Sequence, residues 1–201
     1  MKIFLLITVL LSILTSTKAI IAVVLDTDGD ILKPGAEYYI RPAARDIAGG
    51  IILNSPNNSC PLLIGQAKSG ADLGYPVIFS PVNPNAETLN VGADTNIQVQ
   101  VITICIQSNV WRLTGSEDDT ALYYVATDGV KGNPGKDTLS NWFKVDEYMG
   151  YYKLRFCPGV CNFCKPVCGD LSVVIRDGKR WLVLDKENQP FPFEFVKAWE
   201  E

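Results

Sequence analysis

Residues 122–156 read LYYVATDGVKGNPGKDTLSNWFKVDEYMGYYKLRF, and they carry the clearest indication of the fold class. It holds three short runs rich in β-branched and aromatic residues, at 122–126, 142–145 and 151–156. Between them lie the turn clusters Asp128-Gly129 and Asn133-Pro134-Gly135. Short runs of this composition, bounded by Gly, Pro, Asn and Asp, are typical of β-strands joined by tight turns.

The same pattern recurs on both sides of this stretch. Further runs predict strands at 37–40, 76–79, 96–104, 110–113, 172–175, 181–184 and 192–196. Turn clusters such as Pro34-Gly35 and Asp177-Gly178 separate them, and nothing after the first residues keeps a helical period over three turns. Many short strands with frequent turns predict an all-β barrel or sandwich.

The amino-acid composition excludes several classes of function. The chain has 201 residues, of which 47% are hydrophobic and 20% charged, as expected of one globular domain. Its net charge of −4 and its lack of Lys/Arg runs argue against nucleic-acid binding. The absence of histidine excludes Ser-His-Asp and Cys-His catalysis and His-ligated zinc. We therefore expect a binding or inhibitory protein, not an enzyme, and no cofactor.

The first nineteen residues have the pattern of a secretory signal peptide. Met1-Lys2 precedes a mostly apolar run at 3–14, which ends before the small residues Thr17 and Ala19. The alternative is a membrane anchor, which needs roughly 20 apolar residues and is disfavoured by the short run. We predict a signal peptide at 1–19 and a single domain at 20–201, secreted or vacuolar and without a membrane segment.

An oxidising compartment makes disulfides the preferred state of the six cysteines. Their spacing favours a Cys60–Cys105 bridge and, within the C-x3-C-x2-C-x3-C cluster, Cys157–Cys168 nested around Cys161–Cys164. A four-cysteine zinc site and a redox C-x-x-C remain alternatives. The predicted secretion argues against both, so we expect no metal.

Three further polar features are each open to a functional interpretation. Asp26-Thr27-Asp28-Gly29-Asp30 partly matches a calcium loop, but Ile31 stands where glycine is required, so a solvated turn is favoured. Glu117-Asp118-Asp119 is interpreted as a hydrated acidic turn, and no carboxylate pair stands out as a glycosidase site. Asn57-Asn58-Ser59 is an N-glycosylation sequon with Asn57 as the acceptor.

The loop Ser80-Pro81-Val82-Asn83-Pro84-Asn85 is the strongest candidate for a contact site. Prolines restrict the backbone on both sides of Val82 and Asn83, which favours extended or polyproline geometry. A stiff exposed loop suits a protease cleft because it loses little conformational entropy when it binds. The alternative is an ordinary proline-rich connection.

Several motifs, in one consistent order along the chain, carry a resemblance to a known family. They are Val24-Leu25-Asp26-Thr27-Asp28-Gly29, Tyr38-Tyr39-Ile40, Cys60-Pro61, Phe79-Ser80-Pro81, Val110-Trp111-Arg112-Leu113, Gly132-Asn133-Pro134-Gly135, Asn141-Trp142-Phe143-Lys144 and Phe156-Cys157-Pro158. Together they resemble the plant Kunitz-type (soybean trypsin inhibitor) family, and its miraculin-like branch most closely. The resemblance implies a β-trefoil of twelve strands, six in a barrel and six in a cap with three-fold pseudosymmetry, and the same disulfide bridges.

The resemblance also implies a mode of action, in which one exposed loop enters the protease cleft like a substrate. The loop follows Ser80-Pro81, so its specificity residue is Asn83 and the next residue is Pro84. Trypsin inhibitors of this family carry Arg or Lys at the position of the specificity residue. Asn83 lacks that charge, Pro84 lacks an N–H, and Pro34 stands where the family has a loop-bracing Asn. Trypsin is therefore expected to be a poor target.

Two functions from different classes remain. The first is an inhibitor of a target protease, acting through Val82-Asn83-Pro84 or through another loop, for which Lys68 is the best basic tip and Arg41 and Arg45 are weaker ones. The second is a non-inhibitory miraculin-like defence, storage or recognition protein. No Gln-x-Trp repeats indicate a trefoil lectin. Since all six cysteines pair within the chain, we expect a monomer.

Overall fold

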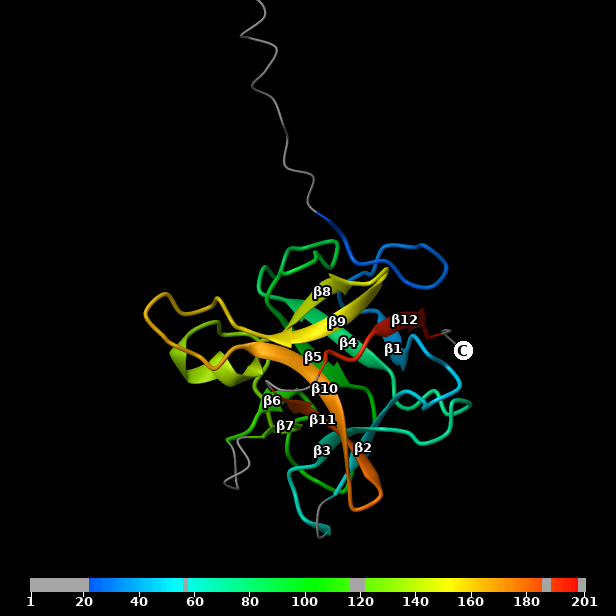
Figure 1. The fold of residues 1–201 in the computed structure, drawn as a ribbon. Helices are drawn as coiled ribbons and strands as arrows, with labels where there is room; N and C mark the ends of the chain where they lie inside the picture. The colour runs from blue at the N-terminus through cyan, green and yellow to red at the C-terminus, as the bar shows by residue number, and fades with distance from the viewer. Residues whose placement is uncertain (1–21, 56–57, 116–121, 186–188, 199–201) are drawn as a thin grey trace, which may run out of the picture.

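The computed structural model describes residues 22–55, 58–115, 122–185 and 189–198, and its regular secondary structure over these residues consists almost entirely of short β-strands joined by loops (Figure 1). The strands are β1 Glu37–Pro42, β2 Ile51–Asn54, β3 Leu63–Gln66, β4 Val77–Pro81, β5 Thr95–Val99, β6 Arg112–Leu113, β7 Tyr123–Ala126, β8 Lys144–Tyr148, β9 Tyr151–Phe156, β10 Gly169–Arg176, β11 Lys179–Leu184 and β12 Phe193–Lys197. One short 3-10 helix, η2 Lys136–Asn141, precedes β8. Within these described ranges, no helix is long and apolar enough to cross a membrane.

Six of the strands form a barrel. Antiparallel pairing runs from β8 through β9, β12, β1 and β4 to β5. An isolated bridge between Thr95 on β5 and Phe143, just before β8, brings the two ends of this series together. The barrel therefore closes with few exposed strand edges.

The other six strands form a cap of three hairpins, β2–β3, β6–β7 and β10–β11. The second strands of the three hairpins all pair with one another: Leu63 with Ala126, Arg180 with Gln66, and Val183 with Tyr124. Three equivalent hairpins meeting in this way give the cap its three-fold arrangement. A six-stranded barrel under such a cap is the β-trefoil that the sequence resemblance implies.

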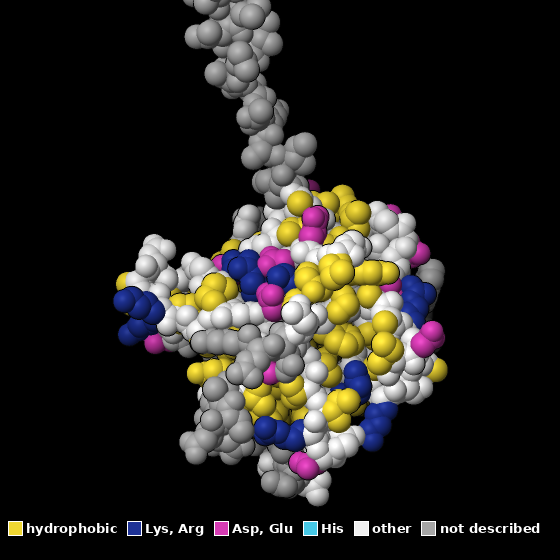
Figure 2. Space-filling model, in the orientation of Figure 1, with side chains coloured by type: hydrophobic (Ala, Val, Ile, Leu, Met, Phe, Trp, Pro, Cys, Tyr) yellow, Lys and Arg dark blue, Asp and Glu magenta, His cyan; other side chains and the backbone are white. Residues whose placement is uncertain are grey.

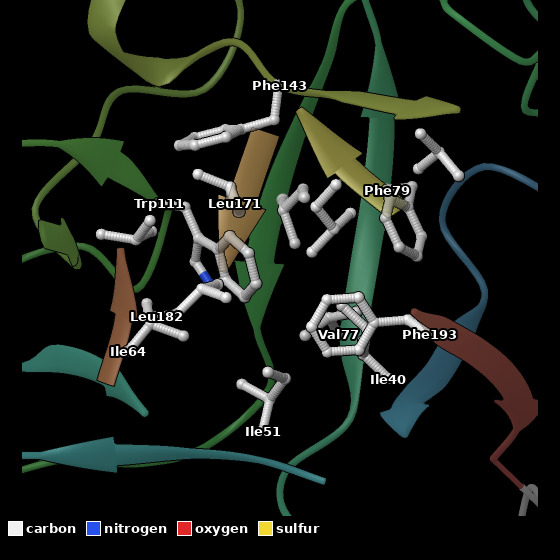
Figure 3. Packing of buried hydrophobic residues seen from close by; sticks show 14 of the residues in the cluster. Ile40, Ile51, Ile64, Val77, Phe79, Trp111, Phe143, Leu171, Leu182 and Phe193 are labelled. Atoms are coloured by element: carbon white, nitrogen blue, oxygen red, sulfur yellow. The ribbon is translucent and has the colours of Figure 1, made fainter. Parts of the chain in front are cut away.

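Large apolar side chains from barrel and cap meet in one core (Figure 3). Trp111, Phe143 and Phe79 are at most 1% exposed. The rings of Trp111 and Phe143 pack edge to face with centroids 5.9 Å apart, a geometry that aromatic quadrupoles favour. Val77 and Leu182 bring barrel and cap strands into the same cluster. The core therefore holds the surface loops on one rigid support.

The structure confirms most strands expected from the sequence and corrects two expectations. β2 and β3 fall in segments for which no strand is predicted. The strand expected at 96–104 ends at Val99, because the chain beyond it leaves the sheet and loses its pairing partner.

The six cysteines pair as the spacing favours. Cys60–Cys105 ties the segment before β3 to the loop after β5, and Cys157–Cys168 encloses Cys161–Cys164 between β9 and β10. All of them are therefore engaged, and none is a free thiol.

Candidate functional site

The candidate contact loop leaves β4 at Pro81 and returns to the core at Leu89. The Val82 N–H donates to the Asp94 carbonyl (2.8 Å), which fixes the start of the loop. Leu89 is fully buried, and its N–H donates to the Leu32 carbonyl (3.0 Å). Ser80 and Pro81 are half-buried, whereas the four residues 82–85 are exposed. The loop thus projects from the barrel between two firm anchors.

At its tip the loop makes a tight turn. The Ala86 N–H donates to the Asn83 carbonyl (3.1 Å), and the Asn85 N–H donates to the side-chain Oδ1 of Asn83 (3.1 Å). Pro84 holds the second position of this turn, where its fixed φ is favourable. The expectation of an extended tip is therefore wrong, because the Asn side chain caps a turn that the following Pro stabilises.

A hollow of about 560 Å³ lies under the loop. Pro34, Pro81, Val82 and Pro84 line it on the loop side. Pro34 can donate no hydrogen bond, so an apolar wall occupies the place of the bracing Asn that the family resemblance implies.

The opposite wall of the hollow is residues 131–134, and buried Asn96 holds this wall in place. Its Oδ1 accepts from the Gly132 N–H (2.7 Å), and its Nδ2 donates to the Asn141 carbonyl (2.9 Å). The sequence analysis missed Asn96, although a polar residue at an inward position of a β-strand is a usable signal of such a network.

Asp94, also missed, joins three segments beside the loop. Its carboxylate pairs with Lys144 on β8 (Nζ to Oδ1, 3.1 Å) and accepts from the Gly159 N–H in the cysteine cluster (3.2 and 3.1 Å). Lys144 also donates to the Gly92 carbonyl (2.9 Å). No local pattern marks such a residue, because its partners are distant in sequence.

Lys68 lies elsewhere, in the loop that follows β3, and its side chain is exposed. The loop backbone is well braced: the Gly49 N–H donates to the Ala67 carbonyl (2.9 Å), and the Asp72 N–H donates to the Ser69 carbonyl (3.0 Å). The structure does not bring Lys68 together with residues 80–85. It presents Lys68 as a separate basic tip on a rigid loop.

Arg41 and Arg45, the weaker basic candidates, are both engaged. Arg41 Nη2 donates to the Gly70 carbonyl (3.3 Å) and so braces the Lys68 loop from beneath. Arg45 Nε donates to Glu194 Oε1 (2.8 Å), and this hydrogen bond and the carboxylate charge raise the pKa of Arg45. Neither side chain is presented as a free cationic tip.

The remaining sequence candidates fall into two groups. Asp26 shapes a turn, because its Oδ1 accepts from the N–H groups of Asp28 (3.0 Å) and Asp30 (2.9 Å). Among the described residues, no cluster of three His, Cys, Asp or Glu side chains could hold a metal ion. The predicted signal peptide at 1–19, Asn57, and Glu117-Asp118-Asp119 lie outside the described residues.

The face drawn in Figure 2 carries no large patch of one charge. Acidic and basic side chains are interspersed over the face drawn in Figure 2, and hydrophobic ones gather over β9 and β12. Tyr151 on β9 is 42% exposed.

Residues 24–197 match a family model of the legume Kunitz type, described as trypsin and protease inhibitor. Miraculin from Synsepalum dulcificum is 42% identical over 184 residues, which are 87% of this chain and 83% of miraculin. Kunitz trypsin inhibitor 5 from Arabidopsis thaliana is 38% identical over 185 residues, 92% of this chain and 90% of that protein.

Solved structures give the same result. The Kunitz-type cysteine protease inhibitor PCPI-3 from potato has 30% sequence identity and a TM-score of 0.77, over 90% of this chain and all of that chain. The expected β-trefoil is thereby confirmed. The residues that match the family model, 24–197, run from before β1 to the end of β12 and so include every strand described above.

Proposed function

Because the chain belongs to the plant Kunitz family of trypsin and protease inhibitors, we propose that it inhibits an endopeptidase by presenting an exposed loop to the enzyme's cleft. The observation that carries the proposal is the loop at 82–88, which projects between a backbone anchor at Val82 and a buried anchor at Leu89. A loop held at both ends spends little ordering entropy on binding. In this proposal the protein binds an enzyme and is not itself one.

The target protease is proposed to be one other than trypsin. A trypsin pocket has an acidic floor that requires Arg or Lys. Asn83 carries no positive charge, and its Oδ1 accepts from the Asn85 N–H, which holds the side chain against its own turn. Pro84 supplies no N–H to an approaching enzyme. The two prolines and the capped turn make residues 82–85 a poor substrate mimic for trypsin.

A second function has a specific observation in its favour. Both the turn at Asn83 and the absence of a hydrogen-bond donor at Pro34 make the loop less like a bound substrate. A non-inhibitory defence, storage or recognition protein resembling miraculin would tolerate both departures. We hold this as the alternative, to be separated by experiment.

The test is a stoichiometric titration of the oxidised protein, without residues 1–19, against trypsin, chymotrypsin, elastase, subtilisin, papain and an aspartic protease. Loss of one activity at a molar ratio near one supports inhibition. Silence across the panel, from a sample with a β-rich spectrum and a cooperative melt, would reject inhibition in favour of the alternative.

We also propose a cellular location and an oligomeric state for the protein. The pattern of a signal peptide at 1–19 supports the proposal that the protein enters the secretory pathway and is secreted or vacuolar. The three intrachain bridges leave no cysteine for an intermolecular disulfide, which favours a monomer. Glycosylation at Asn57 is a proposal of the same kind, and a mass shift removed by a glycosidase would establish it.

A further inference from the structure

The hollow under the 82–88 loop has the size and the lining of a site for a small molecule. Its volume of about 560 Å³ lies within the range of roughly 300–1,000 Å³ that is usual for ligand pockets. Most of the residues that line it are apolar, and they include Phe79, Trp142, Pro34, Pro81, Pro84 and Pro134. Neither the family resemblance nor the proposed function assigns a ligand to this hollow.

Hydrogen bonds within the fold hold the walls of the hollow in place. On the loop side, the Gly35 N–H donates to the Phe79 carbonyl (3.2 Å). On the opposite side, the Thr138 hydroxyl donates to the Asn133 carbonyl (2.6 Å) and accepts from the Trp142 indole N–H (3.2 Å). A ligand therefore meets a site that is already formed, which lowers the entropic cost of binding.

Three polar side chains on the lining are available as hydrogen-bond donors. They are the Lys131 ammonium, the Asn133 amide and the Ser80 hydroxyl. Within the described ranges of the chain, none of these three side chains makes a hydrogen bond or an ion pair with another residue. Lys131 is the one charged residue among the described residues that line the hollow, so its ammonium faces no carboxylate there.

This lining defines a ligand with two parts. The apolar part lies against the proline rings over Phe79 and Trp142, and a rigid ring system fills this space with little loss of conformational entropy. The polar part must be an anion that accepts several hydrogen bonds, because the ammonium of Lys131 repels cations and the neighbouring donors need acceptors. A carboxylate has this charge and this capacity, and its hydrogen bonds to an ammonium are among the strong ones.

From this arrangement we propose that the hollow binds a small aromatic carboxylate, with its rings between the prolines and its carboxylate on Lys131, Asn133 and Ser80. The inference goes beyond protease inhibition and does not depend on it. Such a ligand contacts the loop at Pro81 and the opposite wall at Lys131. It thus joins the two walls in the place where the family resemblance implies a bracing Asn.

The test is a titration of the oxidised protein, without residues 1–19, with 2-naphthoate as the probe, followed by calorimetry and by amide NMR. A ligand of this size in a preformed site should bind with a Kd of about 1 mM or below. The amide signals of Val82 and Gly132 should shift with the same saturation curve. The uncharged 2-naphthamide has the same rings and should bind about tenfold more weakly or worse.

A variant separates recognition of the carboxylate from burial of the rings. Lys131→Gln should weaken binding of 2-naphthoate about tenfold and leave binding of 2-naphthamide unchanged, because the amide has no charge to pair with the ammonium. Since Lys131 is exposed, this variant should keep the wild-type Tm. The matched control is Lys136→Gln, which removes a lysine that is 66% exposed on η2 and does not line the hollow. It should bind both probes as the wild type does.

Three results would overturn the inference. Absence of saturation by 2-naphthoate up to about 10 mM would mean that the hollow is not a site for this class of ligand. Equal affinity of the two probes, or of wild type and Lys131→Gln, would mean that no carboxylate is recognised there. Amide shifts that cluster away from Val82 and Gly132 would place the probe on another part of the surface. None of these results bears on protease inhibition, which the titration against enzymes tests separately.

Discussion

Replacing the buried Asp94 by alanine should destabilise the protein more than breaking an exposed ion pair does. The carboxylate joins Lys144 on β8 to the Gly159 N–H in the cysteine cluster, and it lies at the base of the 82–88 loop. Alanine removes the counter-ion of Lys144 and the acceptor of Gly159 together. Among the residues that the structure describes, the lysine ammonium then keeps only the Gly92 carbonyl as a partner.

The magnitude follows from burial. The side chains of Lys144 and Asp94 are 14% and 11% exposed, so water can replace little of what is lost. Breaking a buried pair by removing one partner costs about 3–5 kcal/mol, and the remaining exposure places this one near the lower end. For a chain of this size about 3 kcal/mol corresponds to a Tm lower by about 6–12 °C.

Thermal unfolding followed by circular dichroism measures this shift, and urea unfolding of Asp94→Ala, Lys144→Ala and the double variant isolates the pair. The coupling energy should be about 1–3 kcal/mol. The matched control is Arg45→Ala, whose ion pair with Glu194 is open to solvent on the arginine side (56% exposed) and should contribute less than about 1 kcal/mol. If Asp94→Ala lowers Tm no more than Arg45→Ala does, or if the coupling energy is zero, the reasoning is refuted.

Three further changes test other parts of the account. Asn83→Arg with Pro84→Ile should create trypsin inhibition by supplying the missing charge, and a double variant that stays inert in a trypsin titration would mean that this loop does not reach the cleft. Replacing the bridged pair Cys60–Cys105 by alanines should lower the free energy of unfolding by about 2–5 kcal/mol, so an unchanged urea midpoint would contradict a stabilising role. Gly129→Ala would place a Cβ 2.5 Å from the Trp111 carbonyl oxygen and should cost about 1–3 kcal/mol; a wild-type Tm would show that the backbone yields freely.

Local sequence pattern predicts most of the strands because each is a short apolar or aromatic run between turn residues. β3 escapes this signal because Gly65 interrupts it. A Cβ there would lie 2.6 Å from the Arg180 carbonyl oxygen, so glycine is required where β3 meets β11. The error at 96–104 is of the opposite kind: the alternation continues past Val99 in the sequence, but the chain forms no strand there and bends at Ile104.

The candidate site was predictable in position but not in shape. The Ser80-Pro81 pair correctly locates a projecting loop after β4. Proline before and after Asn83 suggests extension, but Asn followed by Pro also initiates turns, and here the turn prevails because the Asn side chain caps it. The side chains of Asp94 and Asn96 contact residues at least 36 positions away along the chain, so the sequence does not show which partners they have.

The pairing of the first strand with the last constrains how the protein is made. β1 is in register with β12 over five residue pairs, from Tyr38 with Lys197 to Pro42 with Phe193. During synthesis the barrel therefore stays open until residues 193–197 have left the ribosome. Contacts between residues this distant in sequence form slowly, and β1 and β9 keep exposed edges in the meantime. A nascent chain cut short before residue 193 would retain both edges, which makes loss of the carboxyl end a direct route to aggregation.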